Sequence, residues 1–189
     1  CGSNNCNHID ERSNTETSLG QSICPPIQSS IDASTISSFS SFEYHSVLVL
    51  KNGVIQAAGN NQEGQIFVSL PRKKIEKFTE FKIIDRDGSS LYPISAACGY
   101  DFTLYLVSST KNSEKKFLIY TFKGIKTDFP LFLKIDSNPV SLFVGSYNAA
   151  AVDDKGSVLF IPMWLKNSPE TEIEASTLPG DEKAICVAC

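Results

Sequence analysis

Phe39-Ser-Ser-Phe-Glu-Tyr-His-Ser-Val-Leu-Val49 is the stretch that decides the fold, because a strand with small residues runs through a tight turn into an apolar strand. The same pattern returns in Ala96-Ala-Cys-Gly-Tyr-Asp-Phe-Thr-Leu-Tyr-Leu106 and in Leu142-Phe-Val-Gly-Ser-Tyr-Asn-Ala-Ala-Ala-Val152, and Val187-Ala-Cys189 begins a fourth copy. A repeat of short strands with a period of roughly 50 residues indicates stacked sheets, in a propeller or a related array.

Two independent landmarks give the period of this repeat. The residue that opens the tight turn is Phe42, Gly99 or Gly145, so successive copies are 57 and 46 residues apart. Upstream, Gly2-Ser-Asn-Asn-Cys-Asn-His-Ile9 aligns with Gly59-Asn-Asn-Gln-Glu-Gly-Gln-Ile66, again at a distance of 57 residues. The shared spacing predicts tandem copies of one structural unit, with approximate repeats over 1–58, 59–122, 123–162 and 163–189.

Runs of β-branched and aromatic residues predict strands in groups of four. The expected strands are 26–28, 36–41, 46–50 and 54–58 in the first group, 81–84, 93–98, 103–107 and 117–121 in the middle group, and 131–135, 140–144, 149–152 and 158–161 in the last. Asn52-Gly53 and Asp153-Asp-Lys-Gly156 have the composition of tight hairpin turns. No segment has a sustained helical period. We therefore expect an all-β fold, a partial β-propeller of about three four-stranded antiparallel blades plus the start of a fourth.

Composition and charge narrow the class of protein. The chain has 189 residues, a net charge of −4, 20% charged residues and 41% hydrophobic residues, which is typical of a globular domain. The acidic balance argues against general affinity for nucleic acid or for an anionic membrane. No apolar run approaches the roughly 18 residues that a spanning helix needs. No signal segment is visible either, so we expect an intracellular protein, cytoplasmic or nuclear.

The chain begins at Cys1 and ends at Cys189 inside a predicted strand, so we expect it to be an internal piece of a longer polypeptide. Three blades do not close a ring, and they would leave sheet faces and edges open. The remaining blades of the same polypeptide are therefore one expected partner.

The repeat resembles that of the regulator of chromosome condensation family. Its first part, Gly-x-Asn-x-x-Gly-Gln-Leu-Gly, is matched by Gly59, Asn61, Gly64 and Gln65 and more weakly by Gly2 and Asn4. Its second part is matched in three copies by the residues Ser40, Ser41, His45 and Ser46; Ala97, Cys98, Gly99 and Thr103; and Gly145 and Ala149. Phe42 stands at the glycine position, while Phe102 and Asn148 stand at the histidine position.

The resemblance implies a seven-bladed ring and two possible functions. We expect a non-enzymatic platform that binds proteins, because the loops of a propeller vary without disturbing its sheets. The alternative implied by the resemblance is guanine-nucleotide exchange on a Ran-like small GTPase. Binding to chromatin is a third interpretation, and the acidic charge argues against it.

Candidate catalytic and metal-binding residues have structural explanations. His45 resembles a polar contact inside the blade, and no nucleophile or acid lies at a recognisable spacing from it. Cys186 and Cys189 have the spacing of a zinc site but lie in a predicted strand, where their side chains point to opposite faces. Cys1, Cys6 and His8 form a loose cluster that lacks a fourth ligand. We expect no catalytic residue, no metal and no cofactor.

The densest basic run is Pro71-Arg-Lys-Lys-Ile-Glu-Lys77. Its place after Gly59–Ile66 predicts a loop between blades at one rim. Contact with phosphate is one interpretation, because lysine and arginine neutralise backbone charge. A solvated loop before a strand explains the run as well, and we favour that interpretation. The chain also lacks both GxGxxG and GxxxxGK[ST] phosphate loops.

Overall fold

The computed structural model describes residues 31–85, 87–111, 113–122, 131–161, 171–172 and 175–176. These residues are mostly strand, preceded by one short 3₁₀ turn, η1 (Ala33–Thr35). Several features of the sequence lie outside the described residues, namely Gly2, Asn4, Cys1, Cys6, His8, the expected strand 26–28, Cys186 and Val187–Cys189. Among the described residues no helix is long and apolar enough to cross a membrane.

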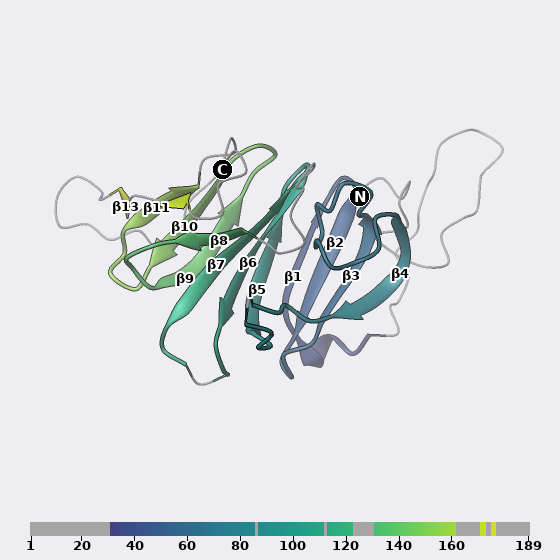
Figure 1. The fold of residues 1–189 in the computed structure, drawn as a ribbon, viewed down its shortest axis with the longest axis horizontal. Coiled ribbons are helices and arrows are strands. Elements are labelled where there is room, and N and C mark those ends of the chain that lie inside the picture. The colour runs from purple at the N-terminus through teal and green to yellow at the C-terminus, as the bar shows by residue number, and fades with distance from the viewer. Residues whose placement is uncertain are drawn as a thin grey trace.

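The first blade is an antiparallel sheet of four consecutive strands (Figure 1). Its strands are β1 (Ile36–Phe42), β2 (His45–Leu50), β3 (Ile55–Asn60) and β4 (Lys74–Phe81). The predicted hairpin turn lies between β2 and β3, where Gly53 has a φ of 83° that glycine adopts without a steric penalty.

The second blade repeats this arrangement. Its strands are β5 (Tyr92–Cys98), β6 (Phe102–Ser108), β7 (Lys116–Phe122) and β8 (Leu131–Lys134). A two-residue strand, β12 (Thr171–Glu172), pairs in parallel with β8 and extends the blade to five strands. The sequence did not predict β12, because a two-residue pairing is too short to leave a pattern.

The third blade consists of β9 (Pro139–Val144), β10 (Ala149–Asp153), β11 (Val158–Ile161) and β13 (Ala175–Ser176). The predicted turn between β10 and β11 is closed by the buried Asp153, whose Oδ1 accepts from the backbone amides of Lys155 at 2.9 Å and Ser157 at 2.7 Å. Short polar side chains stabilise turns in this way.

The all-β fold and the four-stranded blades are as the sequence predicts, but the grouping of two strands is wrong. The strand expected at 81–84 was assigned to the middle group, yet β4 ends at Phe81 and pairs with β3. Ile84 forms only an isolated bridge with Ser90. In the same way, β8 pairs with β7 and closes the second blade rather than opening the third. Chain order alone does not say to which sheet a strand belongs when it lies beside a crossover.

The prediction that the basic run 71–77 is a loop is also wrong in part. Residues 71–73 precede a strand as expected, but they lie in the loop between β3 and β4 of the first blade rather than between blades. Lys74–Lys77 belong to β4 itself. The predicted repeats that begin at residues 59, 123 and 163 describe units of sequence duplication, which differ from the sheets formed by strand pairing. These repeat borders stay a prediction.

Two hydrophobic cores lie between the blades. β6 is buried along its whole length, and its side chains alternate between the two cores. Tyr105 and Val107 pack toward the first blade, whereas Leu104 and Leu106 pack toward the third. The strands β1, β5 and β9 lie next to one another, so the three blades fan out from this line as Figure 1 shows.

Candidate functional site: a row of tyrosines on one rim

Three equivalent tight turns connect the first and second strands of the three blades. Gly99 donates its amide to the carbonyl of Phe102 at 2.9 Å, and Gly145 donates to Asn148 at the same distance. In the first blade the corresponding residues are Phe42 and His45, which pair directly in the sheet. Because β1, β5 and β9 run in the same direction, all three turns lie at the same rim of the propeller.

Each of these turns carries one tyrosine, and the three form a contiguous set that we call the tyrosine row: Tyr44, Tyr100 and Tyr147. The ring centroids of Tyr44 and Tyr100 are 5.2 Å apart in an edge-to-face arrangement, and their hydroxyl oxygens are 3.2 Å apart. The ring centroids of Tyr100 and Tyr147 are also 5.2 Å apart, with the planes inclined by 46°. Aromatic pairs with this spacing attract one another beyond the burial of their area.

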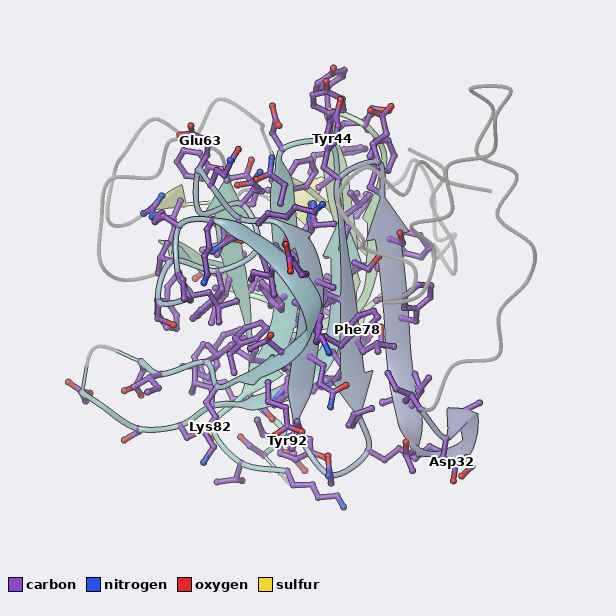
Figure 2. All side chains as sticks on the ribbon, turned by 90° about the vertical axis from the view of Figure 1, so that its right-hand side faces the viewer. Asp32, Tyr44, Glu63, Phe78, Lys82 and Tyr92 are labelled. Atoms are coloured by element: carbon purple, nitrogen blue, oxygen red, sulfur yellow. The ribbon has the colours of Figure 1, made fainter. Side chains whose placement is uncertain are left out.

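The backbone and the solvent exposure complete the geometry of the row. The amide of Tyr100 donates to the carbonyl of Ser146 at 3.0 Å, which links the turns of the second and third blades. Tyr147 is 64% exposed. Figure 2 shows Tyr44 at the same end of the molecule as Glu63, with Lys82, Tyr92 and Asp32 at the other end.

The charged side chains in the turns that carry the row are acidic. Glu43 lies beside Tyr44 in the first turn and Asp101 follows Tyr100 in the second, while the turn segments 43–44, 99–101 and 145–148 contain no lysine or arginine. The pKa of Tyr44 is raised to about 12, first by its hydrogen bond with Tyr100 and to a smaller extent by the Glu43 carboxylate. Both effects disfavour a phenolate at this rim.

A buried polar network beneath the row joins the first two blades. His45 Nε2 lies 2.8 Å from Thr103 Oγ1, and that hydroxyl donates to the carbonyl of Gln65 at 2.9 Å. Since Thr103 has one hydroxyl hydrogen, we assign the Nε2–H tautomer to His45, which then donates to Thr103. Thr121 Oγ1 also donates to the Gln65 carbonyl, at 3.0 Å. His45 and both threonines are fully buried, so the network has a structural role at the blade junction.

Asn61 organises the loop that connects β3 to β4 at this rim. Its Oδ1 accepts from the amides of Ile66 at 2.9 Å and Phe67 at 3.1 Å, and its Nδ2 donates to the carbonyls of Phe67 and Pro71. Gly64 has a φ of 83° within the turn that Asn61 closes. These bonds hold the Gln65 carbonyl where the two threonines reach it.

Two of the glycines permit close approaches. Gly59 has a φ of 111° and lies opposite His45 in the sheet, where a Cβ atom would overlap with the carbonyl oxygen of Tyr44. A Cβ atom on Gly99 would overlap with the ring of Phe102. Both glycines therefore shape the turns that carry the tyrosine row. The assignment of these residues, with Asn61, Gly64, Gln65, His45 and Gly145, as structural repeat positions stays a prediction.

Cys98 is the one cysteine among the described residues, and it is buried. Its Sγ donates to the Ser40 carbonyl at 3.4 Å across the junction of β1 and β5. Burial raises the pKa of the thiol to about 12, and the side chain of Ser40 only partly opposes this rise. Within the described ranges no group of three His, Cys, Asp or Glu side chains is arranged to hold a metal ion.

The inner strands line a hollow of about 610 Å³. Its lining consists of serine, alanine and larger apolar residues of β1, β5 and β9, and none of the lining side chains is acidic, basic or imidazole. Phe39 is 58% exposed there. Hydroxyl and apolar groups line this hollow, and its lining contains no acid or base for catalysis.

Solved structures with a similar fold are found by comparison. Human WBSCR16 matches 78% of this chain and 40% of its own length, with a TM-score of 0.52 and 17% identity. Yeast RCC1 (Prp20) bound to Kap60 matches 67% of this chain and 32% of its own, with a TM-score of 0.49 and 17% identity. Prp20p from Saccharomyces cerevisiae, described with its binding properties to Gsp1p and histones, matches 67% of this chain and 33% of its own length. Its TM-score is 0.47 and its identity is 16%.

No family model matches the sequence, and no curated protein has significant sequence similarity to it. The fold is that of a partial β-propeller. The chain spans 40% of the length of WBSCR16. The number of blades in a complete ring and the activity of a whole protein are therefore matters for proposal.

Sequence reasoning missed the tyrosine row as a unit. All three tyrosines lie within the repeated stretches, but Tyr100 is the first residue of its turn whereas Tyr44 and Tyr147 are the second. An aligned column therefore does not show them together. The signal that could have found them is the presence of one tyrosine in every copy of the turn.

Proposed function

We propose that the protein is a non-enzymatic interaction platform, which binds a protein partner through the rim that carries the tyrosine row. The observation that supports this most directly is the contact of Tyr44, Tyr100 and Tyr147 across three blades. Tyrosine is enriched at protein interfaces, because its ring gives a large contact area at low entropic cost and its hydroxyl bonds to water or to a partner.

The contacts beneath the tyrosine row favour a binding function over a catalytic one. The turns that carry Tyr44 and Tyr100 lie beside the His45–Thr103 hydrogen bond, and the close approach at Gly59 holds the first of them. A rigid array loses little conformational entropy on binding, which increases affinity. His45 lies buried beneath the row and contacts Thr103, which is the arrangement of a structural histidine.

Site-specific photo-crosslinking tests the platform. A photoreactive amino acid at position 147 should capture a partner in cells, while the same amino acid at Lys155, on an exposed turn between β10 and β11, should not capture it. The captured protein is then purified and titrated with the wild type and with Tyr147→Ala. Weaker binding of the variant supports the proposal. Equal capture at both positions, or equal affinity of both proteins, would contradict it.

The alternative function is guanine-nucleotide exchange on a Ran-like small GTPase, and its support is the sequence resemblance. Release of a fluorescent nucleotide from a panel of small GTPases measures this directly. An acceleration at catalytic concentrations of the protein would establish exchange, and its absence across the panel would eliminate it.

Chromatin binding has less support, because the chain has a net charge of −4. Sedimentation with nucleosomes at rising salt concentration tests it, and a lack of binding at low salt would exclude it. An intracellular location and further blades of the same polypeptide as partners also remain proposals.

A further inference from the structure

We propose that the tyrosine row binds an arginine-bearing segment of the partner protein. This inference rests on the proposed function and adds the chemistry of the partner. It follows from two features at the same rim, an exposed set of aromatic rings and a pair of carboxylates in the turns that present those rings.

The aromatic part of the site is accessible. Tyr147 is 64% exposed, and Tyr44 and Tyr100 are partly exposed. Each ring contacts its neighbour at a centroid distance of 5.2 Å, so the row is continuous across the three blades. A cation within about 6 Å of a ring centroid is attracted by the negative face of the ring, and arginine makes this contact more often than lysine does.

The charged part of the site is complementary to a cation. Glu43 and Asp101 occupy turn positions directly beside Tyr44 and Tyr100. Both are solvent-accessible, with Glu43 exposed and Asp101 partly exposed. A guanidinium group can pair with a carboxylate through two parallel hydrogen bonds while its flat face stacks on an aromatic ring. The combination of carboxylates and rings is therefore suited to arginine.

The basic residues of the first blade lie at the same rim as the tyrosine row but outside the turns that carry it. Arg72 and Lys73 end the loop between β3 and β4, and Lys74 pairs with Asn60, whose amide donates to the Tyr44 carbonyl at 2.7 Å. Within the turns themselves the charged side chains are the carboxylates of Glu43 and Asp101. A purely apolar partner would leave both of them unpaired at the interface, which costs binding free energy.

A peptide titration tests the inference on the purified protein. The probe is a fluorescent octapeptide of four Arg-Gly units, and the comparison peptide carries citrulline, which has nearly the shape of arginine but no charge. We expect the arginine peptide to bind in a fluorescence-anisotropy titration and the citrulline peptide to bind at least about tenfold more weakly. A lysine peptide should have intermediate affinity, because it lacks the planar group.

Variants locate the binding. Tyr147→Ala should weaken the arginine peptide about threefold to fivefold, while Phe160→Ala should leave it unchanged, because Phe160 is similarly exposed at 57% but lies on β11. The double variant Glu43→Gln/Asp101→Asn should weaken binding. Asp87→Asn/Glu114→Gln is its matched control, since it removes the same charge from two exposed positions outside the row.

Three results would overturn the inference. The first is equal affinity for the arginine and citrulline peptides, and the second is the absence of any binding. The third is an equal loss in the two double variants, which would indicate general attraction to an acidic protein. Near-UV circular dichroism verifies that each variant is folded. If crosslinking at position 147 still finds a partner whose binding requires Tyr147, the platform stands and only the arginine chemistry fails.

Discussion

His45 Nε2 lies 2.8 Å from Thr103 Oγ1, so a buried side chain of the first blade and one of the second blade meet in a hydrogen bond. The Thr103 hydroxyl continues to the Gln65 carbonyl at 2.9 Å. The junction between two blades, which in a propeller is mainly apolar packing, here also contains a specific polar link. Its geometry fixes the relative position of the turns above it.

Replacing Thr103 with valine removes this link at nearly constant volume. The change leaves a buried imidazole without its Thr103 contact, so we expect the free energy of unfolding to fall by about 1–3 kcal/mol. Urea unfolding followed by tryptophan or tyrosine fluorescence measures it. Thr79→Val is the control, because Thr79 is exposed on β4 and its loss should stay within about 0.5 kcal/mol. Equal effects of the two substitutions would show that the link does not contribute to stability.

Gly59→Ala should be far more costly than the same change at Gly88. Both glycines have a positive φ, 111° and 83°, but only at Gly59 would a Cβ atom meet neighbouring backbone, with His45 Cα 2.6 Å away. We expect a loss of roughly 2–4 kcal/mol at Gly59, from strain and overlap together, and about 1 kcal/mol at Gly88 from backbone strain alone. Thermal unfolding of both variants gives the comparison. Similar melting temperatures would mean that the close approach is not required.

Cys98 should be chemically inert in the folded protein. Its pKa of about 12, raised from 9.0 by burial, leaves roughly a thousandfold less thiolate at pH 8. Treatment with iodoacetamide at pH 8, followed by peptide mass spectrometry, should find Cys98 unmodified in the native protein and modified in 8 M urea. Rapid native alkylation would show that the junction between β1 and β5 opens readily.

Tyr44 should titrate late in alkaline solution. Its pKa of about 12 lies above the ordinary value of 10.0, mainly because of its hydrogen bond with Tyr100. A raised pKa in the folded state means that the associated stability is present below pH 10 and is lost as the pH rises through about 12. Absorbance at 295 nm follows the ionisation. Tyr100→Phe removes the partner hydroxyl and should move the titration of Tyr44 toward pH 10, and an unchanged titration curve would contradict the assignment.

Much of the architecture could be predicted because it depends on local chemistry. Asn52-Gly53 requires a tight turn, since Gly53 adopts a positive φ that other residues avoid. The β-branched, aliphatic and aromatic residues of Thr103–Val107 predict a strand, and β6 covers this run. The strand 81–84 was misplaced because its neighbours in the chain belong to two different sheets, and pairing energy rather than chain order decides between them.

The candidate site could be predicted only in its parts. The sequence contains the turn at 99–102, the buried His45 and the amide of Asn61, and each has a local explanation. It does not contain the distance between Tyr44 and Tyr100, because that distance depends on how two sheets pack face to face. Without the packing, three tyrosines in three turns remain isolated aromatic residues.

The sequence by itself determined the repeated unit. Short strands, glycine turns and alternating small and apolar residues together predict the four-stranded sheet of a propeller blade. Tertiary structure alone decided the blade borders, the parallel addition of β12 and the assembly of the tyrosine row. The physical reason is the range of the interactions. Turn conformation and strand preference are set by neighbouring residues, whereas sheet-to-sheet packing joins side chains more than 40 residues apart, such as Tyr100 and Tyr147.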